Sequence, residues 1–301
     1  MIKNYVNDLP KLAQKYIYRL IDLNKSPETI RTYSHSLKLF FEWYQNEVGT
    51  EMTDDIINKI KYEDLSNYQS YLTSKNYKSG TKYKRLIVLR TFWNWLNEEF
   101  DYKNIAKKLK LPTIEDELPK YLKDKEVIRF LNVIDEYNSK FKKRDKAMFV
   151  ILLNCAIRKS ELLNINMEDI IERKNRMFLK INRKGRKQQM IALNEPTKFI
   201  LEKYIKTRKS NHPALFLSKY NQRISNSNFQ VLFNKYSKLA KLKGYSIHKL
   251  RHTAATKMYE KTKDIKTLQE ILGHKSIKST QIYTHVGEEQ KNNMIDSISY
   301  E

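Results

Sequence analysis

Residues 246–256 read Ser-Ile-His-Lys-Leu-Arg-His-Thr-Ala-Ala-Thr, and residues 272–285 read Leu-Gly-His-Lys-Ser-Ile-Lys-Ser-Thr-Gln-Ile-Tyr-Thr-His. Four of the chain's six histidines fall in these two segments, each close to an arginine, a lysine or a tyrosine. Side chains of these kinds, gathered this closely, indicate a candidate chemical site.

The histidines alone allow a zinc site as an alternative. His248 and His252 are four residues apart, so both would lie on one face of a helix. However, Lys249 follows the first histidine where a zinc-binding helix commonly has Glu, and Arg251 would place a cation beside the metal. We therefore expect no metal at this pair.

Tyr283 and Arg158 indicate a function only when they are considered together with the other candidate residues. Tyr283 alone would be an ordinary packing residue, and Arg158 alone would be half of a surface ion pair. Transesterification at a phosphodiester, however, builds negative charge on the non-bridging oxygens, which two arginines can hold, and it can use a tyrosine that cations and a base activate. The leaving 5′-oxygen needs a proton, which a lysine or histidine can deliver. The sequence offers this set without the carboxylate cluster that two metal ions require, so we expect no cofactor.

At these residues the sequence resembles the tyrosine recombinase (phage integrase) family, and its size resembles that of the Xer-type members. The motif His-x-Leu-Arg-His matches at residues 248–252. The motif Leu-Gly-His, with the nucleophile nine residues after the histidine, matches at residues 272–283. The resemblance covers nearly the whole chain. It implies a site-specific DNA recombinase that cleaves and rejoins DNA through a 3′-phosphotyrosyl intermediate without metal or ATP.

The resemblance also implies a role for each matching residue. Tyr283 is the expected nucleophile, and Glu161 is expected to support the first catalytic arginine. The six expected catalytic residues are Arg158, Lys184, His248, Arg251, His274 and Tyr283.

Two positions depart from the family pattern. Ala156 stands where the family usually has Gly, and we expect little effect because a helical backbone tolerates Ala better than Gly. The family's lysine turn commonly reads Gly-Lys-Gly, whereas this chain has Arg183-Lys184-Gly185. Lys187 is an alternative to Lys184, which is favoured because it precedes the glycine of the turn.

The rest of the sequence predicts a mainly α fold with a small antiparallel β-sheet. Ser26 and Pro27 predict a helix start, and the period of three to four in the apolar residues that follow predicts an amphipathic helix. Further helices are expected at about 11–23, at 64–72, after Gly80, and from about 123 through the apolar run 147–153; short strands are expected at 169–171, 177–181 and 189–193. By the resemblance, residues 1–111 are a helical (SAM-like) core-binding domain, 112–120 a linker, and 121–301 a mixed α+β catalytic domain of the tyrosine recombinase type.

The charge of the chain predicts a polyanionic partner. The net charge is +24, and it is uneven: residues 1–120 carry 20 basic and 16 acidic side chains (+4), and residues 121–301 carry 38 and 18 (+20). Nucleic acid is the usual polyanion, although a lysine-rich surface without such a partner is an alternative. The resemblance implies double-stranded DNA with a specific recombination site. No run of about 18 apolar residues and no secretory leader is visible, and Cys155 is the single cysteine, so we expect a cytoplasmic protein without a membrane span.

The sequence leaves alternatives for the function, the assembly and the C-terminal segment. A type IB-like topoisomerase and a DNA-binding protein without catalysis are the alternative functions. The resemblance implies four subunits, identical or of two kinds, on two DNA sites, for chromosome dimer resolution or for integration and excision of a mobile element. Met294, Ile295 and Ile298 recur at helical spacing, and we expect them to dock on a neighbouring subunit or, alternatively, on their own domain.

Overall fold

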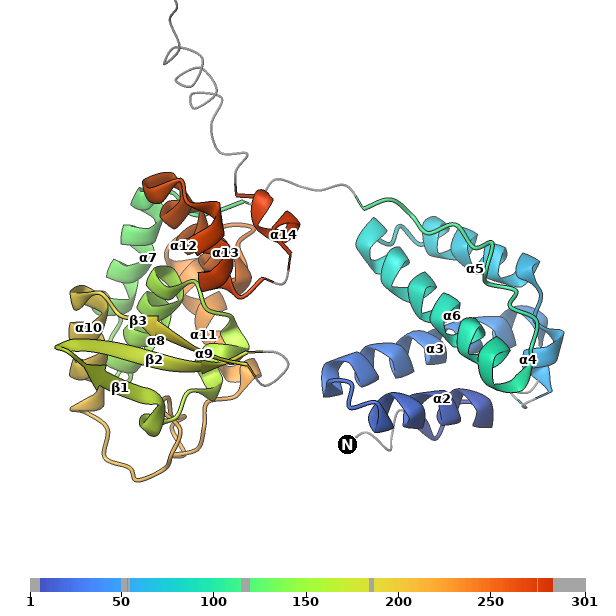
Figure 1. Ribbon diagram of the computed structural model, residues 1–301, viewed down its shortest axis with the longest axis horizontal. Coiled ribbons are helices and arrows are strands. Elements are labelled where there is room, and N and C mark those ends of the chain that lie inside the picture. The colour runs from blue at the N-terminus through green and yellow to red at the C-terminus, as the bar shows by residue number, and fades with distance from the viewer. Residues whose placement is uncertain are drawn as a thin grey trace, which may run out of the picture. The chain divides into compact units, whose positions relative to one another are not determined.

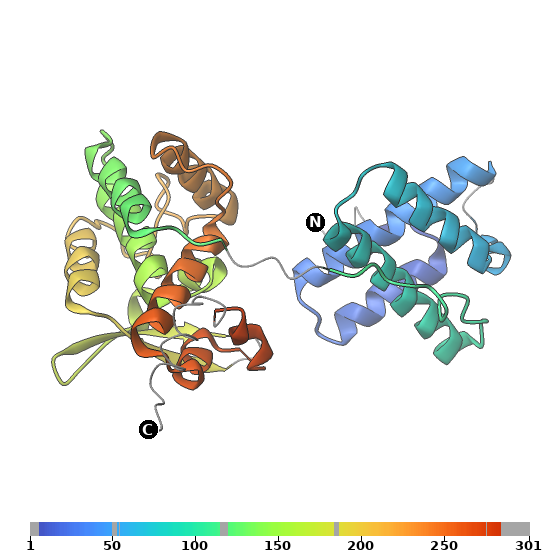
Figure 2. The ribbon, with the colours of Figure 1, turned by 90° about the horizontal axis from the view of Figure 1, so that it is seen from above.

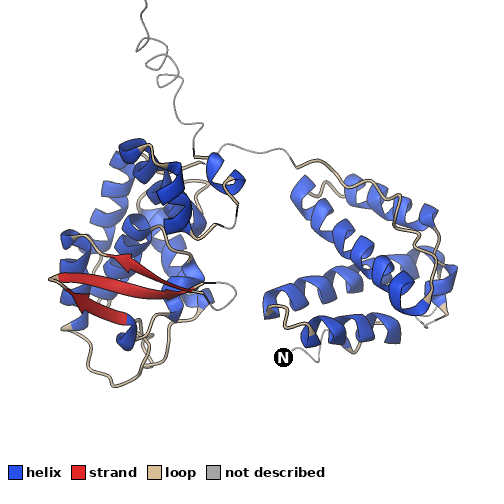
Figure 3. Ribbon diagram, viewed as in Figure 1, coloured by secondary structure: helices blue, strands red, loops and turns tan. Residues whose placement is uncertain are grey.

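The computed structural model describes residues 6–49, 53, 55–114, 120–183, 187–274 and 276–283. The chain divides into two compact units, Met1–Asp116 and Glu117–Glu301. Within the described part, helices form both units and strands occur in the second (Figure 3). The fold is thus mainly α with one small antiparallel sheet, as the sequence predicts.

The first unit is a helical module (Figure 1), and its helices surround a core rich in aromatic side chains. Ser26 caps helix α3 by accepting a hydrogen bond from the Thr29 amide at 3.2 Å, which confirms the predicted helix start. Phe40, Phe92 and Trp93 are fully buried between the helices. The helices are α2 (Lys11–Asp22), α3 (Pro27–Val48), α4 (Ile56–Lys59), α5 (Tyr62–Ser74) and α6 (Ser79–Phe100).

The second unit is built around a buried central helix. Helix α8 (Lys142–Cys155) is buried along most of its length and packs against α7, α10 and α12. The other helices are α7 (Asp124–Glu136), α9 (Lys159–Asn164), α10 (Glu195–Ile205), α11 (Asn226–Leu239), α12 (Ile247–Thr262), α13 (Ile265–Leu272) and α14 (Lys278–Gln281). No helix in the described part is both long and apolar enough to span a membrane.

The sheet has the antiparallel order β1-β2-β3, with strands β1 (Ile170–Arg173), β2 (Arg176–Asn182) and β3 (Gln188–Ala192). Lys174 and Asn175 join β1 to β2, both with positive φ, as a type I′ hairpin turn requires. At the other end of β2, the sheet lies beside the C-terminal end of α13 (Figure 2). This end of the sheet brings Arg183, which follows β2, to the candidate site.

The prediction of one continuous helix from about 123 to 153 is wrong. It is divided into α7 and α8, because Tyr137 is extended and the chain turns at Ser139. The Ser139 hydroxyl accepts a hydrogen bond from the Phe141 amide at 3.1 Å, and such a local bond competes with helical hydrogen bonding.

The expectation that Ala156 has a helical backbone is also wrong. Ala156 ends α8 with φ of 51°, in the left-handed region that favours glycine. The turn at this residue leads the chain from α8 to Arg158. The Ala156 methyl group is fully buried in a small cluster with Ala254, Leu272 and Tyr283.

Substitutions at Ala156 should change the free energy of unfolding through opposing effects. Ala156→Gly removes left-handed strain of about 1–2 kcal/mol. It also loses about 0.8 kcal/mol of methyl burial and adds about 0.5–1 kcal/mol of unfolded-state entropy. We expect a free energy of unfolding within about 1 kcal/mol of the wild type.

Ala156→Val adds a branched side chain at positive φ where no space exists, and it should destabilise the second unit by more than about 2 kcal/mol. Urea unfolding of both variants measures the two effects. A Val variant as stable as the Gly variant would contradict the strained conformation.

Candidate active site

Five of the six expected catalytic residues are described, and they come from several elements of the second unit. Arg158 precedes α9 as its N-terminal capping residue. His248 and Arg251 lie on α12, one turn apart. His274 follows α13 and Tyr283 follows α14, whereas Lys184 lies outside the described residues.

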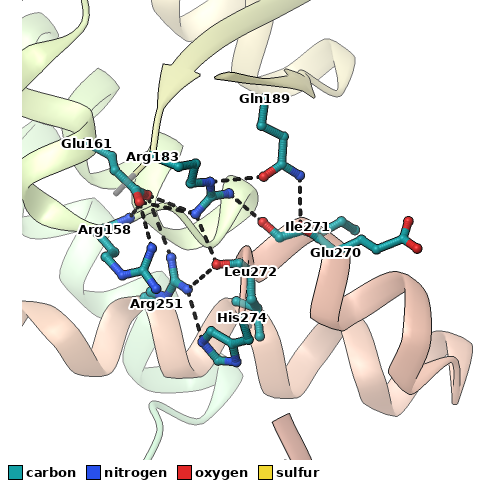
Figure 4. A network of polar contacts seen from close by, with 9 residues as sticks. All are labelled: Arg158, Glu161, Arg183, Gln189, Arg251, Glu270, Ile271, Leu272 and His274. Atoms are coloured by element: carbon teal, nitrogen blue, oxygen red, sulfur yellow. Dashed lines mark hydrogen bonds and ion pairs between the residues drawn. The ribbon is translucent and has the colours of Figure 1, made fainter. Parts of the chain in front are cut away.

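One carboxylate, that of Glu161, joins three arginines (Figure 4). Glu161 Oε1 accepts a hydrogen bond from Arg158 Nη1 at 2.7 Å, and Arg183 Nη1 donates to both carboxylate oxygens at 3.2 and 3.1 Å. Arg251 Nη1 is 3.7 Å from Glu161 Oε2. Three positive charges thus surround one negative charge, which leaves a surplus of two.

The protonation states of this group follow from its surroundings. Burial raises the pKa of Glu161, but hydrogen bonds from Arg158 and the charges of Arg183 and Arg158 outweigh it, so the pKa lies below its usual value. Burial and then Arg158 lower the pKa of Arg251 to about 10. Both groups are therefore ionised at neutral pH.

Arg251 is held tightly but has donors to spare. Its side chain is 3% exposed, and Nη2 donates to the Leu272 carbonyl at 2.7 Å and lies 3.3 Å from His274 Nε2. Its Nη1 is buried and has no hydrogen-bond partner. A buried, charged donor without such a partner is unfavourable, so this atom would be stabilised by an anionic group that reached it.

Tyr283 is buried in this structure. It is 1% exposed, and its hydroxyl lies 2.8 Å from His252 Nδ1. Burial raises the pKa of Tyr283 to about 12, although Arg251 and Arg158 oppose the rise. In the tautomer with its proton on Nε2, His252 accepts the hydrogen bond from the phenol. The sequence placed His252 inside the motif but did not show that it points to Tyr283.

The remaining histidines differ in their surroundings. His274 is half-buried, and its Nδ1 lies 3.0 Å from the Thr280 hydroxyl. His248 is exposed, and its ring stands edge-on to that of His252 with centroids 4.6 Å apart. Among the described residues, no group of three or more His, Cys, Asp or Glu side chains is arranged to hold a metal ion.

A cavity of about 990 Å³ opens over this cluster. Arg158, Glu161 and His274 line it together with Lys187, the alternative to Lys184. The choice between the two lysines stays a prediction. Arg183, which the sequence marked only as a departure from the family turn, is 9% exposed and belongs to the cluster.

Each unit of the chain matches the model of a known protein family or domain. The model of the phage integrase family matches residues 120–290, and that of the phage integrase N-terminal SAM-like domain matches residues 13–99. The first match alone covers more than half of the chain. The chain therefore belongs to the phage integrase family, the tyrosine recombinases.

Relatives within this family include recombinases of the Xer group. The chain is 39% identical over 291 residues to tyrosine recombinase XerC of Caldanaerobacter subterraneus subsp. tengcongensis, covering 88% of this chain and 80% of the relative. It is 34% identical over 266 residues to tyrosine recombinase XerA of Pyrococcus horikoshii, covering 87% and 84%.

Solved structures share the fold at lower identity. XerH site-specific recombinase bound to palindromic difH substrate, in a post-cleavage complex, has a TM-score of 0.74 at 23% identity and covers 91% of this chain and 81% of that one. The Tn1549 transposon integrase in complex with circular intermediate DNA has a TM-score of 0.73 at 18% identity and covers 94% and 98%.

The two half-buried histidines, His252 and His274, predict how stability depends on pH. Burial and then neighbouring cationic groups lower the pKa of His252 and of His274 to about 4, whereas an unfolded histidine titrates near 6.5. Below pH of about 6.5 the unfolded chain binds protons that the folded chain does not bind until about pH 4. The stabilisation is complete above this window and is lost as the pH falls through it.

We therefore expect the urea midpoint of the second unit to fall between pH 6.5 and 4.5, and His252→Gln to flatten part of this fall. Denaturation at several pH values measures the slope. Equal slopes for the wild type and the variant would contradict a neutral, half-buried His252.

Proposed function

We propose that this chain cleaves and rejoins DNA at specific sites, with Tyr283 as the nucleophile. Tyr283 Oη attacks a scissile phosphate, a 3′-phosphotyrosyl bond forms, and a 5′-hydroxyl leaves. A 5′-hydroxyl of the partner strand then attacks this bond and restores the phosphodiester. The observation that carries the proposal is the surplus of two positive charges around Glu161, held close to the buried Tyr283.

The arginines supply the electrostatics of this reaction. Negative charge grows on the non-bridging oxygens in the transition state, and guanidinium groups fixed in advance stabilise it without reorganising. Arg251 Nη1 is buried without a hydrogen-bond partner, and the Arg158 side chain is 36% exposed toward solvent. We assign these two groups to hold the phosphate, and His274, whose Nε2 lies 3.3 Å from Arg251 Nη2, stands beside them.

Two proton transfers complete the cycle. The phenolic proton of Tyr283 must leave as the new bond forms, and His252 Nδ1 at 2.8 Å is placed to accept it. The leaving 5′-oxygen gains a proton, and the resemblance gives this role to Lys184. Because Tyr283 is 1% exposed, its hydroxyl must move into the open before it reaches a phosphate. We expect DNA binding to favour that movement.

DNA is the partner that the charge and the relatives support. Residues 121–301 carry a net charge of +20, which suits the phosphate backbone of a duplex. Solved relatives include recombinases in complex with their DNA sites. We assign residues 1–111 to core binding, 112–120 to a linker and 121–301 to catalysis, in an assembly of four subunits on two DNA sites in the cytoplasm. Met294, Ile295 and Ile298, assigned to subunit docking, lie outside the described residues.

Replacing the nucleophile tests the proposal. Tyr283→Phe removes one oxygen and should abolish the covalent adduct while preserving DNA affinity. Nicked suicide substrates, resolved on denaturing gels in EDTA and without nucleotide, measure the adduct. Tyr259→Phe, another tyrosine packed against the same small cluster, is the matched control and should form the adduct normally. An adduct in Tyr283→Phe, or a wild-type adduct that needs added metal, would contradict the mechanism.

The arginines should act on the transition state more than on binding. Arg158→Ala and Arg251→Ala should each slow cleavage about a hundredfold or more. Arg→Lys should rescue poorly because the planar fork is lost. Single-turnover cleavage and gel shifts on half-site DNA separate rate from affinity, and Arg129→Ala, an exposed change on α7, is the control. Equal losses in rate and affinity would make the residue a phosphate anchor only.

A further inference from the structure

Arg183 is a buried arginine at the edge of the site, and each of its three guanidinium nitrogens donates a hydrogen bond within the protein. It follows β2 directly, and its side chain is 7% exposed. Its backbone amide donates to the Lys187 carbonyl at 2.7 Å. A glycine, which the family commonly has before the lysine, would supply the amide but no guanidinium.

The guanidinium joins three separate parts of the second unit (Figure 4). Nη1 donates to Glu161 and, at 3.0 Å, to the Leu272 carbonyl. Nη2 donates to the Ile271 carbonyl at 2.6 Å, and Nε donates to Gln189 Oε1 at 2.9 Å. The last carbonyls of a helix lack partners within the helix, so Arg183 acts as a side-chain cap for α13.

The Leu-Gly-His turn is shaped to receive this arginine. A Cβ on Gly273 would lie 3.1 Å from Arg183 Nε and 3.2 Å from its Cδ and Cζ. Gly273 also has φ of +62°, so glycine is favoured there for two separate reasons. Gln189 reinforces the contact, because its Nε2 donates to the Glu270 carbonyl at 2.9 Å.

Arg183 and Arg251 hold the same two acceptors. Both approach Glu161, and both donate to the Leu272 carbonyl, Arg251 at 2.7 Å. The last residue of this turn is His274, whose ring contacts Arg251 and Thr280, and Tyr283 follows three residues after Thr280. A shift of the turn would therefore move His274 and disturb the segment that leads to Tyr283.

From this geometry we infer that Arg183 is a positioning residue for the recombination reaction: it fixes the Leu272–His274 turn against Glu161, and through that turn it sets the places of His274 and Tyr283. It does not act on the phosphate itself, because each of its three guanidinium nitrogens already donates within the protein. The inference rests on the proposed role of Tyr283 and adds a residue to which neither the motifs nor the family pattern gives a role.

Two substitutions in the full-length chain separate geometry from charge. Arg183→Lys keeps the positive charge but loses the planar fork, and Arg183→Met removes both. We expect both to slow single-turnover cleavage of a nicked suicide substrate about a hundredfold, the scale of an ångström-sized misplacement. The affinity for half-site DNA, measured by gel shift, should stay near that of the wild type.

Arg208→Met is the matched control. Arg208 also donates to backbone carbonyls, those of Ser210, His212 and Ala214, but outside the candidate site. It should lower the melting temperature yet cleave like the wild type below its melting transition. Arg183→Lys with wild-type cleavage would overturn the inference, and so would a fall in affinity that matches the fall in cleavage.

A milder substitution keeps the test decisive if the Arg183 variants do not fold. Gln189→Leu removes the acceptor of Arg183 Nε and the donor to Glu270 while keeping the rest of the network. A smaller loss of cleavage at unchanged affinity supports the inference, and unchanged cleavage contradicts it. A wild-type chain that forms no Tyr283 adduct would instead refute the proposed function.

Discussion

The arrangement of the site depends on the sharing of one buried carboxylate by three guanidinium groups. Glu161 is 6% exposed at its side chain, so its charge and those of Arg183 and Arg251 are largely withdrawn from water. Such burial is unfavourable unless each charge has close partners. One carboxylate supplies those partners and still leaves a positive surplus for a phosphate. A second carboxylate would cancel more of the positive surplus. Without any carboxylate, the three guanidinium groups would repel one another.

Two backbone turns position groups that the three arginines contact. At Ala156 the left-handed conformation ends α8 and directs the chain toward Arg158 and Glu161. At Gly273 a second left-handed residue ends α13 and presents the Leu272 carbonyl to Arg183 and Arg251. Both turns directly follow helices that pack in the second unit. The packed helices therefore fix the positions of the turns and of the charged side chains next to them. The strain at Ala156 is the unfavourable part of this arrangement.

Tyr283 packs differently from the large core of the second unit. It belongs to a small cluster with Ala156, residues of α12 and residues of α13. A small cluster opens at a lower free energy than a main core. This suits the proposed nucleophile, which is 1% exposed here and would have to meet DNA. The hydrogen bond to His252 and the raised pKa of Tyr283 keep the phenol protonated in the buried position.

The sequence by itself determined the class of fold, the helix start at Ser26, the three strands and the motif residues, because these depend on local period, capping and spacing. It could not determine that Ala156 is left-handed, since the conformation of one residue after a helix depends on what the next segment must reach. It also left Arg183 and His252 without roles. Their partners lie 88 residues along the chain at Ile271 and 31 residues along at Tyr283, and only tertiary packing brings such groups within hydrogen-bond distance.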